Sequence, residues 1–150
     1  MKTFILLVFT ATVLSVSDLT AGNPGTGSAT GSVVLLDNNM FKQKVFNYEA
    51  NKTWKYEGTM PAIIDFYADW CGPCRMMSPL IDEIAKKYAG RIVVYKVDTD
   101  KERLLSQSLG ISSLPTLLFI PVKGQPQASL GAIPRESLEK AINEVLMIKK

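Results

Sequence analysis

The sequence predicts an α/β domain with a central mixed β-sheet flanked by helices on both faces. Short apolar runs alternate with amphipathic segments from residue 33 onward, which is typical of a sheet with a parallel core. The run "PAIIDFYA" at residues 61–68 has one acid among apolar residues, as expected of a strand buried on both faces. The last two apolar runs flank a turn at Gly124, which indicates a closing antiparallel hairpin. The predicted element order is β-α-β-α-β-α-β-β-α.

The domain is expected to begin with a strand, a helix and a loop. The apolar residues 33–36, "VVLL", predict a short strand. Asp37 or Asn38 then caps a helix over residues 39–48, where apolar side chains recur at mostly helical spacing. Residues 49–60 are polar and predict a loop that leads into the buried strand.

The second helix is expected over residues 74–90, with Gly90 as its C-terminal signal. Its spacing predicts an apolar side formed by Met76, Met77, Leu80, Ile81, Ile84 and Tyr88. The apolar residues 91–98 predict the next strand. A short helix over residues 101–110, which ends at a glycine, completes this part of the domain.

The C-terminal part is expected to form two strands and the last helix. Residues 115–120 and 128–132 predict strands on either side of the turn at Gly124. The amphipathic residues 134–148 predict a helix, because Pro134 suits the first helical turn.

The N-terminus is interpreted as an export signal. Lys2 precedes an apolar run at residues 4–16, which is shorter than the roughly 20 residues that a membrane-spanning helix needs. We therefore expect residues 1–21 to be a signal peptide, with cleavage after about Ser17 to Ala21. An uncleaved membrane-anchoring helix is the alternative.

The remaining chain is expected to hold a linker and one folded domain. Residues 22–32 are small, polar and rich in glycine, which predicts a flexible linker. Residues 33–150 are enough for one domain with a hydrophobic core, since 47% of the whole sequence is hydrophobic.

The composition excludes several kinds of site. The chain has no histidine, which removes Ser–His and Cys–His catalysis and any histidine-bound metal. Two cysteines are too few for a four-thiolate zinc site, so we expect no metal. The net charge is +3 and the basic residues are scattered, which does not predict a nucleic-acid partner.

The two cysteines lie where a strand gives way to a helix, in "DWCGPC" at residues 69–74. Exposed N–H groups and the helix dipole at a helix N-terminus favour a thiolate. We expect Cys71 to be the exposed attacking thiol, and Cys74, one turn into the helix, to be the shielded thiol that resolves a mixed disulfide. A structural clip is the alternative, but so small a ring constrains the unfolded chain little.

Three segments resemble the thioredoxin family. "DFYADWCGPCRMMSP" is similar to its strand, active site and kinked helix, "SSLPT" to its cis-proline loop, and "KGQ" with "SLGA" to its closing hairpin. The resemblance covers about residues 33–148. It implies the thioredoxin fold and a redox-active Cys71–Cys74 disulfide that works without a bound cofactor.

The resemblance implies supporting roles for two charged residues. Asp65 matches the family's buried acid, whose pKa burial should raise. It would accept the proton of Cys74, through a water, when the mixed disulfide is resolved. Lys96 matches the lysine that moderates this pKa. The alternatives are a strand-end acid paired with a surface lysine and a plain edge-strand lysine.

The resemblance also implies a surface for the substrate. Pro115 matches the cis-proline, which would let the Leu114 backbone pair with an extended substrate; a trans-proline that opens an edge strand is the alternative. Trp70 would form a hydrophobic rim or, alternatively, fill the core. Gly131 and Ala132 match a flat apolar patch, although Gly131 as a simple turn glycine is the alternative.

The direction of electron flow stays open between two readings. Gly72 and Pro73 favour a reductant, because Pro73 has no N–H to donate to a sulfur. We therefore expect an exported, monomeric thiol-disulfide oxidoreductase in the bacterial periplasm that reduces disulfides in client proteins and takes electrons from a membrane donor. An oxidant or isomerase suits that compartment, and a non-enzymatic scaffold is a further alternative.

Overall fold

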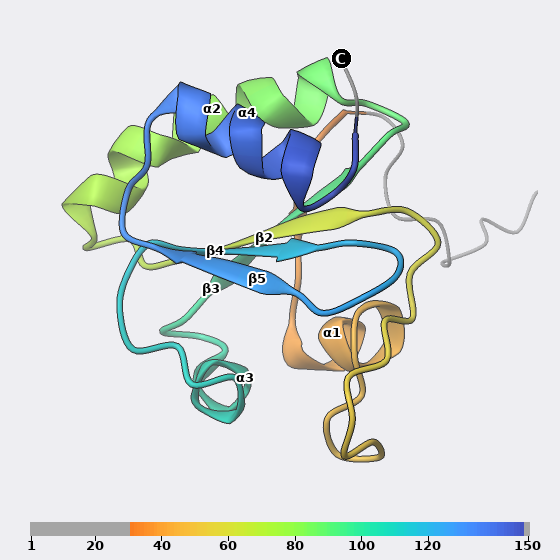
Figure 1. Ribbon diagram of the computed structural model, residues 1–150. Helices are drawn as coiled ribbons and strands as arrows, with labels where there is room; N and C mark the ends of the chain where they lie inside the picture. Colours follow the sequence, from red (N-terminus) through yellow and green to blue (C-terminus); the bar gives the residue numbers. More distant parts are fainter. Residues whose placement is uncertain (1–30, 149–150) are drawn as a thin grey trace, which may run out of the picture.

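The computed structural model describes residues 31–148, and the predicted signal peptide and most of the predicted linker lie outside this range. Within these residues, a five-stranded sheet runs through the molecule in the order β1-β3-β2-β4-β5 (Figure 1). Its strands are β1 Val34–Leu35, β2 Ala62–Tyr67, β3 Val93–Asp98, β4 Thr116–Ile120 and β5 Gln127–Leu130.

The strand pairing confirms the predicted mixed sheet. β3 pairs in parallel with both β1 and β2, whereas β4 pairs antiparallel with β2 and with β5. β2 is thus the central strand, and five of its six residues are buried. Its register places Asp65 between Lys96 of β3 and Leu117 of β4.

Two helices cover each face of the sheet. α2 (Gly72–Lys87) and α4 (Arg135–Glu144) lie together on one face, and α1 (Asn38–Lys44) and α3 (Arg103–Ser108) lie on the other (Figure 1). The element order and the helices on both faces match the prediction. Within residues 31–148, no helix is long and apolar enough to cross a membrane.

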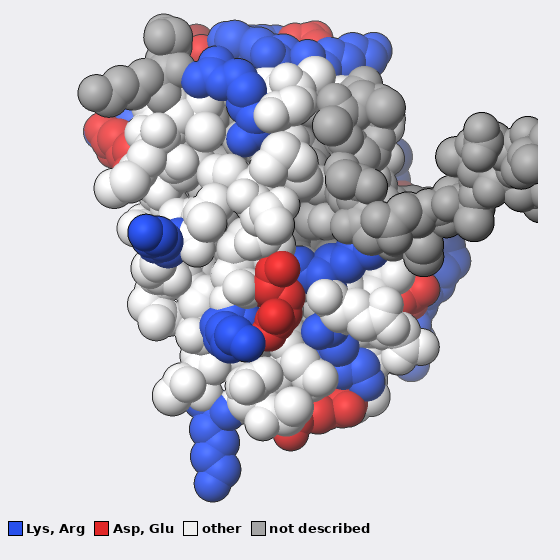
Figure 2. Space-filling view, turned by 90° about the vertical axis from the view of Figure 1, so that its right-hand side faces the viewer, with Lys and Arg blue, Asp and Glu red and all other residues white. Residues whose placement is uncertain are grey.

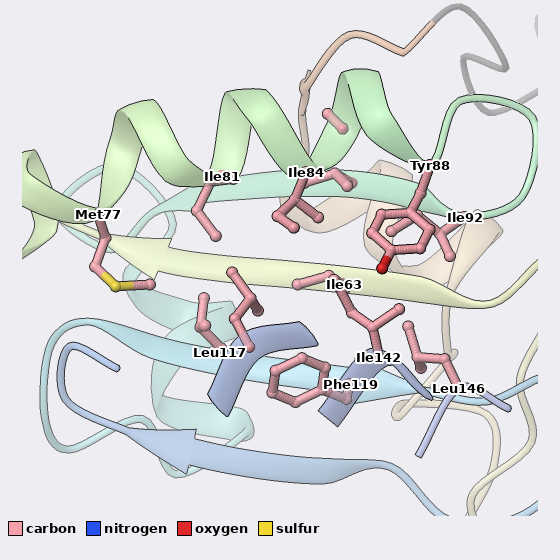
Figure 3. Packing of buried hydrophobic residues seen from close by; sticks show 13 residues of the cluster. Ile63, Met77, Ile81, Ile84, Tyr88, Ile92, Leu117, Phe119, Ile142 and Leu146 are labelled. Carbon is pink, nitrogen blue, oxygen red and sulfur yellow. The ribbon is translucent and has the colours of Figure 1, made fainter. Parts of the chain in front are cut away.

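Each face of the sheet carries its own hydrophobic core, because alternate residues of a strand point to opposite faces. Beneath α2 and α4, Ile63 of β2 packs with Ile81 and Ile84 of α2 and with Phe119 of β4 (Figure 3). Beneath α1 and α3, Ile64 and its neighbours form the second core. Asp65 shares the α2 side of the sheet with Ile63.

Two helices differ from the sequence-based expectation. α1 ends at Lys44 because the Val45 carbonyl accepts a hydrogen bond from the Glu57 N–H at 2.9 Å, which turns the chain into the loop. α2 begins at Gly72 rather than at residue 74. The expected apolar position Met76 is 73% exposed, because it lies off the stripe of buried side chains that contacts the sheet.

The loop before β2 is held against the second core by its aromatic residues. The Trp54 ring lies 4.8 Å from the ring of Phe46, centroid to centroid. The Tyr56 hydroxyl donates a hydrogen bond of 2.7 Å to the Met60 carbonyl. These contacts give the polar loop a defined path along the α1 side of the sheet.

Candidate active site

The two cysteines lie at the junction of β2 and α2, at the left of Figure 1. Cys71 is the N-cap of α2 and forms a disulfide with Cys74, with the two Cα atoms 5.3 Å apart. The Cys74 N–H donates to Cys71 Sγ at 3.2 Å. A thiolate at Cys71 would receive this bond together with the positive end of the α2 dipole, which lowers the pKa of a thiol.

Both cysteines are buried in the disulfide, which corrects the expectation that Cys71 is exposed. Cys71 is 3% exposed and Cys74 is 1% exposed. The cause is local packing, because Ala68, Tyr67 and Leu114 contact the pair. Exposure in the disulfide form therefore does not distinguish the two cysteines, whereas their positions at the start of α2 do.

Asp65 lies fully buried on the α2 side of the sheet, and neither carboxylate oxygen has a hydrogen-bond partner among the described residues. Burial raises its pKa to about 6; the positive charge of Lys96 opposes the rise and the negative charge of Asp82 adds to it. A carboxyl that titrates near neutral pH can take a proton and release it again.

Lys96 lies directly across from Asp65 on the neighbouring strand. Its Nζ is 3.8 Å from Asp65 Oδ2, which makes an ion pair but is too long for a hydrogen bond. The same Nζ lies 4.8 Å from the centre of the Tyr67 ring. The structure thus brings together the acid and the lysine that the resemblance implied.

The proline loop meets the closing hairpin beside the disulfide. The peptide bond between Leu114 and Pro115 is cis, as the resemblance implied. The Gly131 N–H donates to the Pro115 carbonyl at 2.8 Å, and Ala132 follows at the exposed surface. Gly131 has φ +78°, so its place at the end of β5 favours glycine on conformational grounds as well.

Trp70 is a surface residue and not core filler. Its side chain is 70% exposed, and the indole Nε1 donates to Asp100 Oδ2 at 2.9 Å. Gly72 is partly exposed and Pro73 is exposed in the first turn of α2. Trp70 therefore presents an apolar ring next to the disulfide, held by the loop after β3.

Sequence reasoning missed one side chain of the site, Ser78. It lies one turn after Cys74 on α2, and its hydroxyl accepts a hydrogen bond of 2.7 Å from Lys96 Nζ. A spacing of four residues from Cys74 was the available signal, since such residues share a helix face. The packing of α2 against the sheet places Ser78 within reach of Lys96 on β3.

Residues 31–148 hold no cluster of three cysteine, aspartate or glutamate side chains that fits a metal ion. The groups that the structure shows at the site are the two sulfurs of the Cys71–Cys74 disulfide and the buried carboxyl of Asp65 in the preceding strand β2.

Comparison with known families agrees with this geometry. The model of the family described as Thioredoxin matches residues 32–144, which include every residue of the site. The chain belongs to the thioredoxin family. It is 51% identical over 104 residues to a thioredoxin of Borreliella burgdorferi, with 69% of this chain and 89% of that protein covered.

More distant relatives share the same domain. Thioredoxin 1 of Nostoc is 37% identical over 106 residues, covering 71% of this chain and 90% of that protein. An M-type chloroplastic thioredoxin of Spinacia oleracea is 38% identical over 99 residues, which span 55% of that protein. The crystal structure of chloroplastic thioredoxin z superposes with a TM-score of 0.65 at 24% identity, over 78% of this chain and 96% of that one, which shows the fold.

Family membership and the Cys71–Cys74 pair establish the general chemistry. The chain is a thiol-disulfide oxidoreductase. Thioredoxins act on disulfide-containing substrates. In this chain the WCGPC sequence carries the cysteine pair for that reaction, which forms a disulfide.

Proposed function

We propose that this protein is an exported, monomeric thioredoxin that reduces disulfides in client proteins of the bacterial periplasm. The observation that supports electron flow from this protein to its client is in the first turn of α2. There Pro73 has no N–H, and the Cys74 N–H donates to Cys71 Sγ. With few donors to stabilise it, the Cys71 thiolate stays a good electron donor, so the disulfide form is favoured.

The proposed reaction moves two electrons from the dithiol to the client. The Cys71 thiolate attacks one sulfur of the client disulfide, forms a mixed disulfide and releases the other client sulfur as a thiolate. Cys74 gives its proton to Asp65 through a water and attacks Cys71 Sγ. This breaks the mixed disulfide, releases the second client thiolate and leaves the Cys71–Cys74 disulfide.

The proposed substrate surface surrounds the disulfide. The backbone of Leu114 would pair with an extended client segment, and Trp70, Gly131 and Ala132 would contact its side chains. The support is their placement: Leu114 packs on the cysteines, the Gly131 N–H donates to Pro115, and Trp70 is exposed beside Cys71.

No nucleic-acid partner is proposed. On the end of the molecule away from the disulfide, basic and acidic side chains are interspersed with uncharged ones (Figure 2). Such a surface lacks the continuous basic stripe of a nucleic-acid site. The site needs no bound cofactor, since the two electrons are held in the cysteine pair.

The proposed periplasmic location depends on the apolar residues 4–16 as a signal peptide. Outside the cytosol, a membrane carrier would return electrons to the Cys71–Cys74 disulfide. We expect the mature protein recovered from the periplasm to begin after about Ser17 to Ala21 by N-terminal sequencing. A periplasmic protein that retains Met1 would contradict cleavage.

We expect a reduction potential of about −270 mV, the value for thioredoxins. Equilibration with glutathione or dithiothreitol followed by mass spectrometry of the alkylated protein measures it. The matched variant Pro73→Ala adds an N–H next to Cys71 and should raise the potential. A wild-type value near −120 mV, as in strong oxidants, would instead favour the alternative of an oxidant or isomerase.

Thiol trapping in the cell tests the direction separately. Acid quenching and alkylation of the exported protein should find Cys71 and Cys74 mostly reduced, because the electron donor of a reductase keeps its cysteine pair in the dithiol form. A pair that is mostly oxidised in growing cells would contradict the reductase and favour the oxidant.

A further inference from the structure

The ammonium of Lys96 bonds to a hydroxyl although a buried carboxylate is close by. Its Nζ donates to Ser78 Oγ at 2.7 Å, whereas the distance from Nζ to Asp65 Oδ2 is 3.8 Å. The Lys96 side chain is 14% exposed and that of Asp65 is not exposed. In this partly buried setting, the lysine makes its short contact with the neutral partner and not with the charged one.

The Ser78 hydroxyl is well suited to hold that ammonium. An ammonium group can only donate, so Ser78 Oγ is the acceptor. The hydroxyl proton is then free for the Cys74 carbonyl one turn earlier, and Ser78 Oγ lies 3.3 Å from that oxygen. Ser78 is thereby fixed from both sides, between the backbone of the resolving cysteine and the lysine.

Asp65 is left without a hydrogen bond by this arrangement. Both of its oxygens are buried without a partner among the described residues. Leu117 flanks it on β4 and is apolar, so Lys96 is the cross-strand neighbour that can neutralise it. An ammonium in direct contact would join two opposite charges in one hydrogen bond and would stabilise the carboxylate more than the present separation of 3.8 Å does.

We propose that Ser78 is a positioning residue that holds the Lys96 ammonium off the Asp65 carboxylate by accepting its hydrogen bond. The proposal deepens the proposed function, since it assumes that Asp65 accepts the Cys74 proton. A carboxylate in direct contact with an ammonium is a weak base, because the ion pair stabilises its charged form. The Ser78 hydroxyl keeps Asp65 basic enough to accept a proton near neutral pH.

The other ionisable groups around Asp65 do not replace this effect. Asp82, on α2, is exposed, and its negative charge adds to the raised pKa of Asp65. Tyr67, on β2, has a raised pKa and is therefore neutral near pH 7. Cys74 carries no charge in the disulfide form. Lys96 is thus the cation whose distance sets how strongly Asp65 holds its proton.

A hollow of about 300 Å³ reaches this group of residues from the surface. Its lining includes Ser78, Lys96, Cys74, Tyr67, Asp69 and Arg75. It gives water access to Lys96, whose ammonium lies 3.8 Å from Asp65 Oδ2. The hollow also offers the Lys96 ammonium a second position, where it would be solvated by water and farther from Asp65.

The test is the titration of Asp65 in the oxidised protein, followed by carboxyl carbon NMR. In Ser78→Ala, Lys96 Nζ should move onto Asp65, and the midpoint should fall by about one pH unit, as expected for a new contact with an opposite charge. Alanine suits this helical position, so the variant should fold. The acid limb of the pH profile of insulin reduction should move in the same direction.

Two further variants test whether the change in midpoint depends on the Ser78 hydroxyl and on the Lys96 ammonium. Ser78→Thr keeps the hydroxyl and should restore the wild-type midpoint. In a Lys96→Met background, Ser78→Ala should leave the midpoint unchanged, because the ammonium is gone. An unchanged or raised midpoint in Ser78→Ala alone would overturn the proposal, since the ammonium would then have stayed in place or moved into the hollow. The titration needs no turnover, so its result can contradict the role of Ser78 while the protein still reduces insulin. A wild-type protein that does not reduce insulin would instead contradict the proposed function and leave the titration result unaffected.

Discussion

Cys71→Ser is expected to lose disulfide reductase activity down to the rate measured without protein. A serine hydroxyl does not ionise near neutral pH, and the thiolate is the nucleophile in disulfide exchange. Cys71 is also the cysteine whose sulfur receives the Cys74 N–H at the start of α2. The measurement is insulin reduction with dithiothreitol as the electron source, followed as turbidity.

Cys74→Ser is expected to accumulate mixed disulfides with clients, because Cys71 still attacks but no resolving thiol follows. Non-reducing gels and mass spectrometry of the exported protein should show adducts on Cys71. The double variant Cys71→Ser with Cys74→Ser is the matched control and should show none. Full insulin reduction by either single variant would refute the exchange mechanism.

Asp65→Ala should slow turnover at neutral pH and at the same time stabilise the oxidised protein. The rate falls because Cys74 loses its proton acceptor, and general base catalysis commonly contributes about 10²-fold or more. The effect should be smaller at alkaline pH, where the thiol ionises without help. The measurement is the pH profile of insulin reduction, and unchanged kinetics at neutral pH would remove the proton-transfer role.

The stability change follows from the pKa of Asp65, which burial raises to about 6 from the ordinary 3.8. The folded state holds the proton more tightly than the unfolded state, so the free energy of unfolding falls as pH rises from about 4 to about 6. Above that window the buried carboxylate costs about 3 kcal/mol, at 1.36 kcal/mol for each pH unit. Lost packing offsets about 1 kcal/mol, so we expect a gain of about 2 kcal/mol at pH 8.

Urea unfolding of the oxidised protein at pH 8 and at pH 4 measures this gain. It should be present at pH 8 and largely absent at pH 4, where Asp65 is protonated in the folded state. Glu144→Ala, which removes an exposed carboxylate at the end of α4, is the control and should show no such pH-dependent gain. A destabilised Asp65→Ala at pH 8 would show that the carboxylate supports the fold.

The local signals of the sequence predicted most of the fold. The alternation of apolar runs and amphipathic segments predicted the element order, and Asp37 caps α1 as expected, with its carboxylate accepting from the Met40 N–H. Helix ends were less predictable. The chain leaves α1 early because the Val45 carbonyl bonds to Glu57, a contact that depends on the path of the following loop.

The exposure of single side chains was the weakest expectation. Met76 has a residue type and spacing compatible with the apolar side of α2, yet it is exposed because it lies off the stripe of α2 side chains that packs on the sheet. Cys71 was expected at the surface, and neighbours from β2 and the proline loop bury it. Burial depends on what packs against a residue, which neighbours in sequence do not determine.

By itself, the sequence determined the chemistry of this protein: two cysteines at a helix start, a proline between them and an acid in the preceding strand. These features depend on residue type and short spacing. The tertiary structure decided the distances that set the pKa of this acid, because strand pairing places Lys96, which the family resemblance implied, beside Asp65, and helix packing brings Ser78 to the same ammonium. The pKa of a buried carboxyl depends on distances of a few ångströms between groups far apart in the chain, and only the packed fold fixes them.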